Sequence, residues 1–411
     1  MRASELRGPL AGTISAGDRA PEGRDGERPP GPCAGHPVGA RAGASRTRRA
    51  TRVIYAGEVP IGAPHPVVVQ SMAKVDPHDA EAVARQADEL AELGAGLVRL
   101  AVPDKAAAEA IAEVRRRSRA TLVADIHYDP RLAIAAIEAG AHKIRVNPGN
   151  LRGGEDAVRA IAEAAARSRV PIRVGANSGS LSPAFRDRAS TGTEAPGEAL
   201  ALAVLEGCRA FERANFRELV VSAKGSDVIS TIGAARLLAA RTEYPVHIGL
   251  TAAGIPELAW AKSAVAIGAL LAEGIGDTVR VSYTGPPHEE VAAARAILEA
   301  VGLVRSGPEI VSCPTCGRTR VDLVRAVEAV REALRDLAVP LRVAVMGCEV
   351  NGPGEARDSD VGLACGREGG WLFARGERLR RVREAEMVQA LVELAREEAA
   401  RLAPAAPEGV R

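Results

Sequence analysis

Two cysteines separated by two residues stand in the segment SCPTCGR. Their spacing, Cys313 to Cys316, suits half of a zinc site, a redox disulfide or two ligands of an iron–sulfur cluster. A third cysteine, Cys348, opens the segment CEVNGPGEA directly after a predicted strand. The glycines there let the backbone pass close to a bulky group. Three thiolates without an obvious fourth are typical of an iron–sulfur cluster with one distinctive iron.

Two residues compete for the fourth ligand position. Glu355 follows Cys348 after a short interval and would place a carboxylate oxygen on the fourth iron, leaving an exchangeable Lewis-acid position. Cys365, in ACGREGG, is the rival, although it is more simply interpreted as a small residue packed in a turn. Cys33 and Cys208 are expected to be bystanders. Structural zinc remains an alternative, with four thiolate ligands: Cys313, Cys316, Cys348 and Cys365.

Arginines recur inside apolar segments, in the tripeptides VRL, IRV, IRV and VRV. A guanidinium in such a place is costly unless an anion or a carboxylate meets it. With one lysine, these cations would converge from five strands: Arg99, Arg145, Arg173, Lys224 and Arg280. Few acidic residues accompany them, and this excess of positive charge suits a substrate with two phosphoryl groups. The alternative is that each arginine pairs with a helix carboxylate on the outside of the fold.

Other polar residues end the same segments. Asp125 and His127 alternate along ADIHYD, so they project to one side and are candidates for binding a substrate hydroxyl or moving a proton. A structural role is nearly as well supported for His127 alone. Asn147 is a candidate for substrate binding and Asn177 is a candidate catalytic residue, with a turn role as an equal alternative for both.

Eight short β-branched segments carry these residues and alternate with Ala-, Leu- and Glu-rich segments of helical period, as in parallel α/β folds. Eight strands, each followed by a helix, predict a TIM barrel over residues 51–302, with its active site at the strands' carboxyl ends. A doubly wound open sheet is the alternative, but the first strand lacks a glycine-rich turn. The segments are 67–72, 97–102, 121–128, 143–148, 172–179, 218–223, 246–251 and 277–284.

The remaining chain divides into a tail and a smaller domain. Residues 1–50 are rich in Gly, Pro, Ala and Arg without apolar periodicity, which predicts disorder; a transit peptide is disfavoured by the acidic residues. Residues 303–403 predict an α+β domain. We expect strands at EIVSCP, 341–347 and VGLAC, a helix over roughly 322–337, and a closing helix from about Arg378.

Composition narrows the class of protein. The 411 residues are 46% hydrophobic with a formal net charge of +2, so charge gives no reason to expect a nucleic-acid or membrane partner. The chain has no apolar run of about eighteen residues, the length that a spanning helix needs. Its 6 cysteines are too few for a secreted disulfide scaffold, which favours a reducing cytoplasm.

The ordered motifs resemble the 4-hydroxy-3-methylbut-2-enyl diphosphate synthase family of the non-mevalonate isoprenoid pathway. The resemblance runs from about Val67 to Gly376 and rests on VVVQSM, LVRLAVP, VADIHYD, KIRVNPGN, IRVGANSGSL, VVSAKGSDV, EGIGDTVRVS, SCPTCGR and VMGCEVNGPGEA. It implies a TIM barrel joined to a [4Fe–4S] domain. It also implies reductive ring opening and dehydration of 2-C-methyl-D-erythritol 2,4-cyclodiphosphate, with electrons from ferredoxin or flavodoxin, in a head-to-tail homodimer.

The same resemblance implies roles for individual residues. The cluster ligands would be Cys313, Cys316, Cys348 and Glu355. The substrate diphosphate would be held by Arg99, Arg145, Arg173, Lys224 and Arg280. Other positions of the substrate site would be Asp125, His127, Asn177 and Ser282.

Two departures from the family pattern bear on activity. The family's TEAG is TAAG here, so Ala252 stands where a glutamate is thought to assist proton transfer, and Ala73, Lys74 and Val75 replace a Thr/Asn-rich run. Loss of a general acid costs about 10² to 10⁴ in rate; Glu257 is a nearby candidate replacement. Two further hypotheses follow: a diverged paralogue that binds cluster and diphosphate with little turnover, and a zinc-stabilised TIM-barrel enzyme acting on another phosphorylated substrate.

Overall fold

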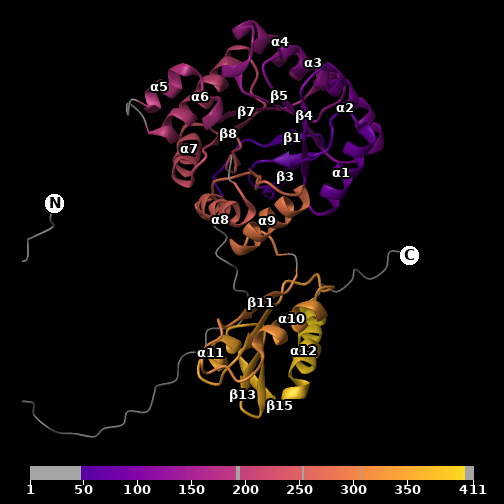
Figure 1. The fold of residues 1–411 in the computed structure, drawn as a ribbon, viewed down its shortest axis with the longest axis vertical. Coiled ribbons are helices and arrows are strands. Elements are labelled where there is room, and N and C mark those ends of the chain that lie inside the picture. Colours follow the sequence, from indigo (N-terminus) through magenta and orange to yellow (C-terminus); the bar gives the residue numbers. More distant parts are fainter. Residues whose placement is uncertain (1–47, 191–194, 252–253, 306, 403–411) are drawn as a thin grey trace, which may run out of the picture. The chain divides into compact units, whose positions relative to one another are not determined.

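The computed structural model describes residues 48–190, 195–251, 254–305 and 307–402. Nearly all of the predicted tail, including Cys33, lies outside these residues, and so does Ala252. None of the helices in the described ranges is long and apolar enough to cross a membrane. Figure 1 labels the elements along the chain.

Eight parallel strands form one sheet in the order β8-β7-β6-β5-β4-β3-β10-β9. A parallel bridge between Val221 and Val246 joins its two ends, so the sheet closes, and the predicted TIM barrel is confirmed. The last two strands are shorter than expected, and Gly249, with a φ of +153°, stands directly after β9. The strands are β3 (Val68–Met72), β4 (Leu97–Val102), β5 (Leu122–Ile126), β6 (Lys143–Val146), β7 (Ile172–Asn177), β8 (Leu219–Lys224), β9 (His247–Ile248) and β10 (Thr278–Val279).

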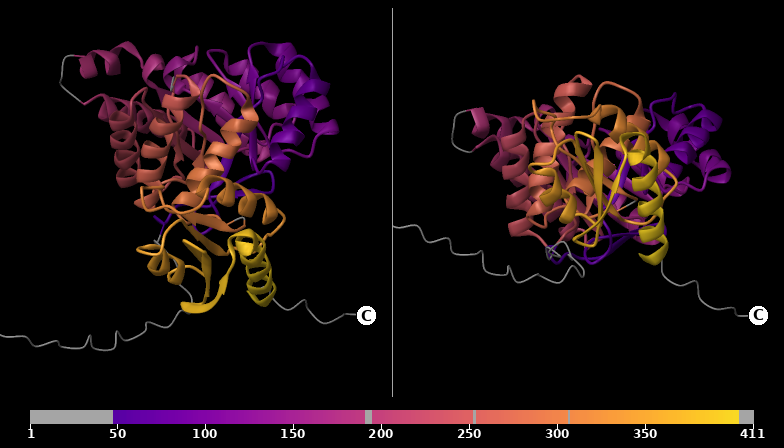
Figure 2. Two further views of the ribbon diagram at one scale, coloured as in Figure 1. Left: turned by 60° about the horizontal axis from the view of Figure 1, so that its bottom comes forward. Right: turned by 90° about the horizontal axis from the view of Figure 1, so that it is seen from below.

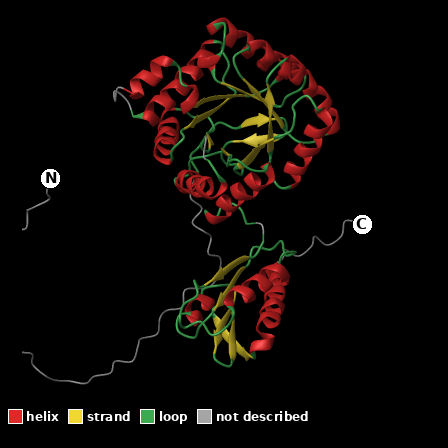
Figure 3. Ribbon diagram, in the orientation of Figure 1, coloured by secondary structure: helices red, strands yellow, loops and turns green. Residues whose placement is uncertain are grey.

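Helices surround the strands in a ring (Figure 3). Several begin at an aspartate whose carboxylate accepts a backbone N–H of the first turn: Asp79, Asp104, Asp129 and Asp227. Such caps satisfy donors that the helix itself leaves unpaired. The helices are α1 (Ala80–Glu92), α2 (Lys105–Arg117), α3 (Pro130–Glu138), α4 (Gly154–Ser168), α5 (Pro183–Ser190), α6 (Pro196–Arg213), α7 (Val228–Arg241), α8 (Pro256–Ala272) and α9 (Pro287–Ala300).

An unpredicted hairpin closes the amino-terminal end of the barrel. Strands β1 (Ile54–Ala56) and β2 (Val59–Ile61) pair antiparallel around Gly57. Their apolar side chains pack on residues from β4, β5 and β8: Leu97, Val123 and Val220. Just before the hairpin, Arg48 forms an ion pair with Asp277, which precedes β10. This segment therefore joins the beginning of the barrel to its last strand.

The carboxyl-terminal part contains a five-stranded mixed sheet. Strands β11 (Glu309–Ser312), β12 (Arg342–Met346) and β13 (Val361–Gly366) are parallel, whereas β14 (Gly369–Ala374) and β15 (Glu377–Val382) are antiparallel to their neighbours. Helices α10 (Leu323–Ala333) and α12 (Met387–Leu402) pack on one face, and Figure 2 shows α12, in yellow, beside these strands. The short helix α11 (Gly352–Arg357) packs on the other face.

The expected closing helix from about Arg378 is wrong, because that segment forms β15 and α12 begins at Met387. Gly369 and Gly376 have φ values of +126° and +82°, so they allow the two tight turns that fold β14 and β15 back on the sheet. The strands expected at EIVSCP, 341–347 and VGLAC are present as β11, β12 and β13.

Candidate functional site

The five predicted cations converge inside the barrel. Asp125, Arg145 and Arg173 occupy paired positions on β5, β6 and β7, and paired residues of parallel strands share one face. Arg173 is 2% exposed. Its pKa is lowered by burial and then by the guanidinium groups Arg99, Arg145 and Arg280. Burial, then Arg173 and then the same three arginines also lower the pKa of Lys224. These side chains therefore share one buried, positively charged space.

Asp125 is the carboxylate at the centre of this group. Its oxygens lie 3.7 Å from Arg99 Nε and 3.3 Å from Arg145 Nη1. His127 Nε2 lies 3.5 Å from Asp125 and 3.1 Å from Arg145 Nη1. Burial would raise the pKa of Asp125, but Arg99, His127 and Arg145 outweigh burial and hold that pKa far below its usual range. Asp125 is therefore ionised and orients the two arginines.

A second buried carboxylate, Glu290, was not predicted. It lies in the first turn of α9 and is 2% exposed. Lys74 Nζ lies 2.7 Å from one of its oxygens and Arg280 Nη2 lies 3.3 Å from the other. Arg280 thus has a helix carboxylate as a partner, while its charge also acts on Arg173 inside the barrel. Lys74, from the segment that departs from the family pattern, also donates to the backbone carbonyl of Tyr283 and so ties two loops of the barrel together.

Buried polar atoms without a hydrogen-bond partner concentrate in the barrel. Within the described ranges, they include atoms of Gln70, Lys143, Arg145, Arg173, Ser222, His247 and Arg280. Such atoms cost free energy unless water or a ligand meets them. Sequence reasoning missed Lys143 and His247. Lys143 stands two positions before Arg145 on β6, so strand alternation was the signal that places it on the same face.

Gly249 makes room for two of the cations. A Cβ at this position would lie 2.9 Å from Lys224 Nζ and 2.3 Å from the backbone oxygen of Arg280. Both distances are shorter than real Cβ contacts, so only glycine fits between the Lys224 side chain and the Arg280 backbone without a shift of that backbone. The positive φ of Gly249 leads to the same requirement.

The remaining predicted residues of the barrel hold its loops. Asn147 Oδ1 accepts the N–H of Gly149 at 3.2 Å, and its Nδ2 donates to the Ser180 carbonyl at 3.1 Å. The side chain of Asn177 caps the turn that ends at Ser180. Ser282 Oγ donates to the Leu250 carbonyl at 3.1 Å. Asn147 therefore has the turn role that its sequence context left open, and Ser282 also fixes a loop.

Two of the predicted cluster cysteines follow adjacent parallel strands. Cys313 comes after β11 and Cys348 shortly after β12, and the N–H of Gly347 donates to Cys313 Sγ at 3.4 Å. The N–H groups of Asn351, Val350 and Gly352 lower the pKa of Cys348, although its partial burial opposes them. The backbone N–H and then the guanidinium of Arg318 lower the pKa of Cys316. The contacts to Cys348 and Cys316 favour thiolates, the form that binds metal.

Cys365 and Cys208 have a different environment. Cys365 is fully buried in the core between the sheet and α12, and burial raises its pKa to about 12. Cys208 is buried on α6, and burial likewise raises its pKa. Neutral thiols in apolar cores are inert. The rival fourth ligand, Cys365, is therefore placed as a packing residue.

Glu355 is exposed in the first turn of α11. It lines a shallow pocket together with Val350, Asn351, Gly354, Arg357 and Asp358. In the part of the chain that the structure describes, no three His, Cys, Asp or Glu residues are grouped as they would be around one metal ion. The ligands of a cluster bind different irons and stand farther apart. N–H groups aimed at the sulfur atoms of Cys313 and Cys348 fit sulfur ligands of a cluster.

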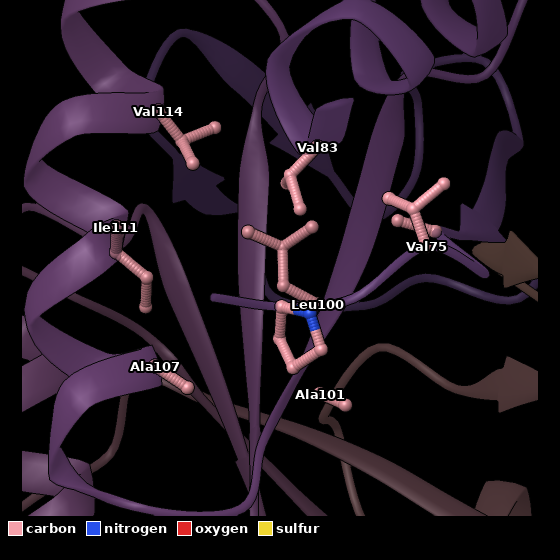
Figure 4. A pocket seen from close by; sticks show the side chains of 9 residues that line it. Val75, Val83, Leu100, Ala101, Ala107, Ile111 and Val114 are labelled. Carbon is pink, nitrogen blue, oxygen red and sulfur yellow. The ribbon is translucent and has the colours of Figure 1, made fainter. Parts of the chain in front are cut away.

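A separate apolar pocket lies between β4 and helices α1 and α2. Figure 4 shows its lining by Val75, Val83, Leu100, Ile111, Val114 and small neighbours. Every lining side chain is apolar, so this space is a gap between layers and offers nothing to an anionic ligand.

Two family models, both for domains of the GcpE protein, match this chain. The family model described as the GcpE TIM-barrel domain matches residues 51–295, and the GcpE protein C-terminal domain matches residues 309–397. Among solved structures, a dihydropteroate synthase from Xanthomonas albilineans aligns with 62% of this chain and 100% of its own, at 20% identity and a TM-score of 0.45. That structural similarity is too weak to support a conclusion.

Three curated relatives carry one name, 4-hydroxy-3-methylbut-2-en-1-yl diphosphate synthase (flavodoxin). The protein from Salinispora arenicola is 47% identical over 87% of this chain and 90% of its own length. Those from Salinispora tropica and Mycobacterium bovis are 46% and 45% identical, over 89% and 88% of this chain and 93% and 92% of their own lengths. The chain belongs to the 4-hydroxy-3-methylbut-2-en-1-yl diphosphate synthase family.

Proposed function

We propose that this chain catalyses the reductive ring opening and dehydration of 2-C-methyl-D-erythritol 2,4-cyclodiphosphate to 4-hydroxy-3-methylbut-2-enyl diphosphate. The observation that carries the proposal is the buried barrel cluster, in which two guanidinium nitrogens of Arg173 have no partner among the described residues and three other arginines act on its charge. A doubly anionic substrate supplies the missing partners. The shared name of the relatives supports the same reaction.

In this proposal the barrel residues act mainly through charge and position. Arg145, Arg173 and Lys224 bind the phosphoryl groups, with Arg99 and Arg280 completing the set. Fixed cations stabilise the negative charge that develops on the leaving phosphate, because they need no reorganisation during the reaction. Asp125 holds Arg99 and Arg145 in place through its two oxygens. His127, whose side chain is 44% exposed, is free to bind a substrate hydroxyl or to move a proton.

We further propose that Cys313, Cys316 and Cys348 hold a [4Fe–4S] cluster and that Glu355 is its fourth ligand. When bound, the cluster would supply electrons one at a time and a Lewis-acid iron. The protein's own contribution is the set of N–H groups that favour the thiolate of Cys348 and the exposed carboxylate of Glu355, which is free to move aside. Metal and labile-sulfide analysis of anaerobically purified protein tests this: zinc without sulfide would support the zinc-stabilised alternative.

The proposal extends to partners and domains. Flavodoxin is named in the curated relatives, and we propose flavodoxin or a ferredoxin as the electron donor here. Residues 51–302 would form the substrate domain and 303–403 the cluster domain. We propose a homodimer in which each active site is shared between two chains.

Anaerobic turnover of the cyclodiphosphate with a chemical reductant tests the activity. The wild-type protein is compared with Ala252→Glu, which restores the family residue, because Ala252 is the one observation that favours the diverged paralogue. Wild-type turnover at ordinary enzyme rates supports the synthase. Turnover that appears only in the Ala252→Glu variant supports a binding protein that has lost its general acid.

A further inference from the structure

Lys143 is a buried amine that the proposed reaction does not yet use. It begins β6 and is 0% exposed. Its Nζ has no hydrogen-bond partner among the residues that the structure describes. Its place two positions before Arg145 on the strand puts it on the interior face, one step closer to the end that the β1–β2 hairpin closes.

The groups that face Lys143 are other bases. Arg99 on β4 and Arg173 on β7 act on its charge. Lys143 in turn acts on the charge of His247 on β9, whose Nε2 is also without a partner in the described ranges. Among the described residues, the charges that shift the pKa of Lys143 are those of Arg173 and Arg99, both cations. A buried ammonium with only cationic neighbours is strongly disfavoured.

We propose that Lys143 is a further substrate-binding residue, the innermost cation of the diphosphate site, and that it takes up a proton from solvent when the diphosphate binds. This inference rests on the proposed function, because the ligand is the same diphosphate. No bond other than the N–H bond of Lys143 is formed or broken.

Lys143 is expected to take up a proton because a bound diphosphate changes the charges around its amine. Burial and then the charges of Arg173 and Arg99 hold the pKa of Lys143 well below its usual value while the site holds no anion. A bound diphosphate neutralises those arginines and offers oxygens to the amine, so the ammonium becomes the favoured form. His247 and Lys224 have lowered pKa values from similar causes, so variants must separate the contribution of Lys143.

The test is calorimetric titration at pH 7.5 in buffers of different ionisation enthalpy, which counts the protons taken up on binding. The ligands are the cyclodiphosphate and, separately, inorganic pyrophosphate, without reductant so that no turnover occurs. For Lys143→Met we expect affinity to fall about 10- to 100-fold, the cost of one charge-assisted bond, and proton uptake to fall by about one. The matched control is Lys105→Met on the exposed face of α2, which should leave both quantities unchanged.

A second variant distinguishes loss of the titrating amine from misfolding. Lys143→Arg keeps a permanent positive charge, so it should bind the diphosphate while taking up about one proton less than the wild type. Wild-type affinity and proton uptake in both Lys143 variants would overturn the inference and leave the proposed function standing. Failure of the wild-type protein to bind either ligand would instead overturn the diphosphate site itself.

Discussion

The barrel interior would bind an anion and the cysteine loops would bind metal ions. The surroundings destabilise the charged side chains in the barrel but stabilise those in the cysteine loops. Inside the barrel, burial and neighbouring cations lower the pKa values of Arg173 and Lys224, so the charged forms are held under electrostatic stress. In the cysteine loops, N–H groups and Arg318 lower the pKa values of Cys348 and Cys316, so the charged thiolates are stabilised. The two regions thus differ in how much their charged forms depend on a ligand.

This difference predicts opposite responses to mutation. Removing a buried cation from the barrel should weaken substrate binding without lowering the free energy of unfolding, because an unpaired buried charge does not stabilise the fold. Removing a cluster thiol should abolish function outright, because a cluster needs its ligands. Three experiments test the contrast, and a fourth measures a partly buried histidine outside both regions for comparison.

The largest effect is expected for Cys348→Ser. The variant should lose iron, labile sulfide and all reductive turnover, since one of the three thiolates is gone. The measurement is iron and sulfide content with turnover under anaerobic conditions. Cys365→Ala is the control and should keep its cluster, because Cys365 is a neutral core thiol. Loss of iron from the control with retention in Cys348→Ser would contradict the ligand set.

Arg173→Met is expected to lower kcat/KM by about 10² to 10³, the effect of losing one preorganised charged donor. Its thermal unfolding temperature should stay the same or rise, because the guanidinium is buried with unpartnered nitrogens. Steady-state kinetics and calorimetry measure the two effects. A variant that loses activity only because it unfolds would argue against the stressed-cation interpretation.

Asp125→Asn removes the carboxylate that pairs with Arg99 and Arg145. Its removal leaves Arg99 and Arg145 without their shared counter-ion, so we expect a loss of about 3 kcal/mol of unfolding free energy. Denaturant unfolding with and without pyrophosphate measures it. Pyrophosphate should restore part of the loss, whereas equal destabilisation in both conditions would show that the carboxylate has no electrostatic role.

His142 gives the smallest effect, outside both regions. Its Nδ1 accepts the N–H of Leu122 at 2.9 Å, and burial together with Arg115 lowers its pKa to about 4. The unfolded state binds the proton more readily, so stability falls as the pH drops from about 6.5 toward 4. Because the ring is partly exposed, we expect a loss of only about 1 kcal/mol. Unfolding of His142→Gln should lack this part of the pH dependence.

Sequence patterns predicted the repeated features well. Short β-branched segments between helical segments predicted the strands that carry Arg99, Arg145 and Arg173. The β1–β2 hairpin was missed because three-residue strands carry almost no periodic signal. Glu290 was missed because an acidic residue in a first helical turn is ordinary, and only the fold brings it to Lys74 and Arg280. Lys143 stands two positions before Arg145, so strand alternation predicts that both side chains share one face.

The pairing of Arg48 with Asp277 has a consequence for synthesis. The two residues are 229 positions apart, and the ring of strands cannot close before the second of them has left the ribosome. At the usual pace of translation the amino-terminal segment waits roughly 10 to 45 s for its partner. During that time the barrel is open, so the apolar side chains of the hairpin lack the complete amino-terminal end of the barrel on which they pack. A nascent chain stalled before Asp277 is therefore the form in which this protein is most exposed to aggregation and to chaperone binding.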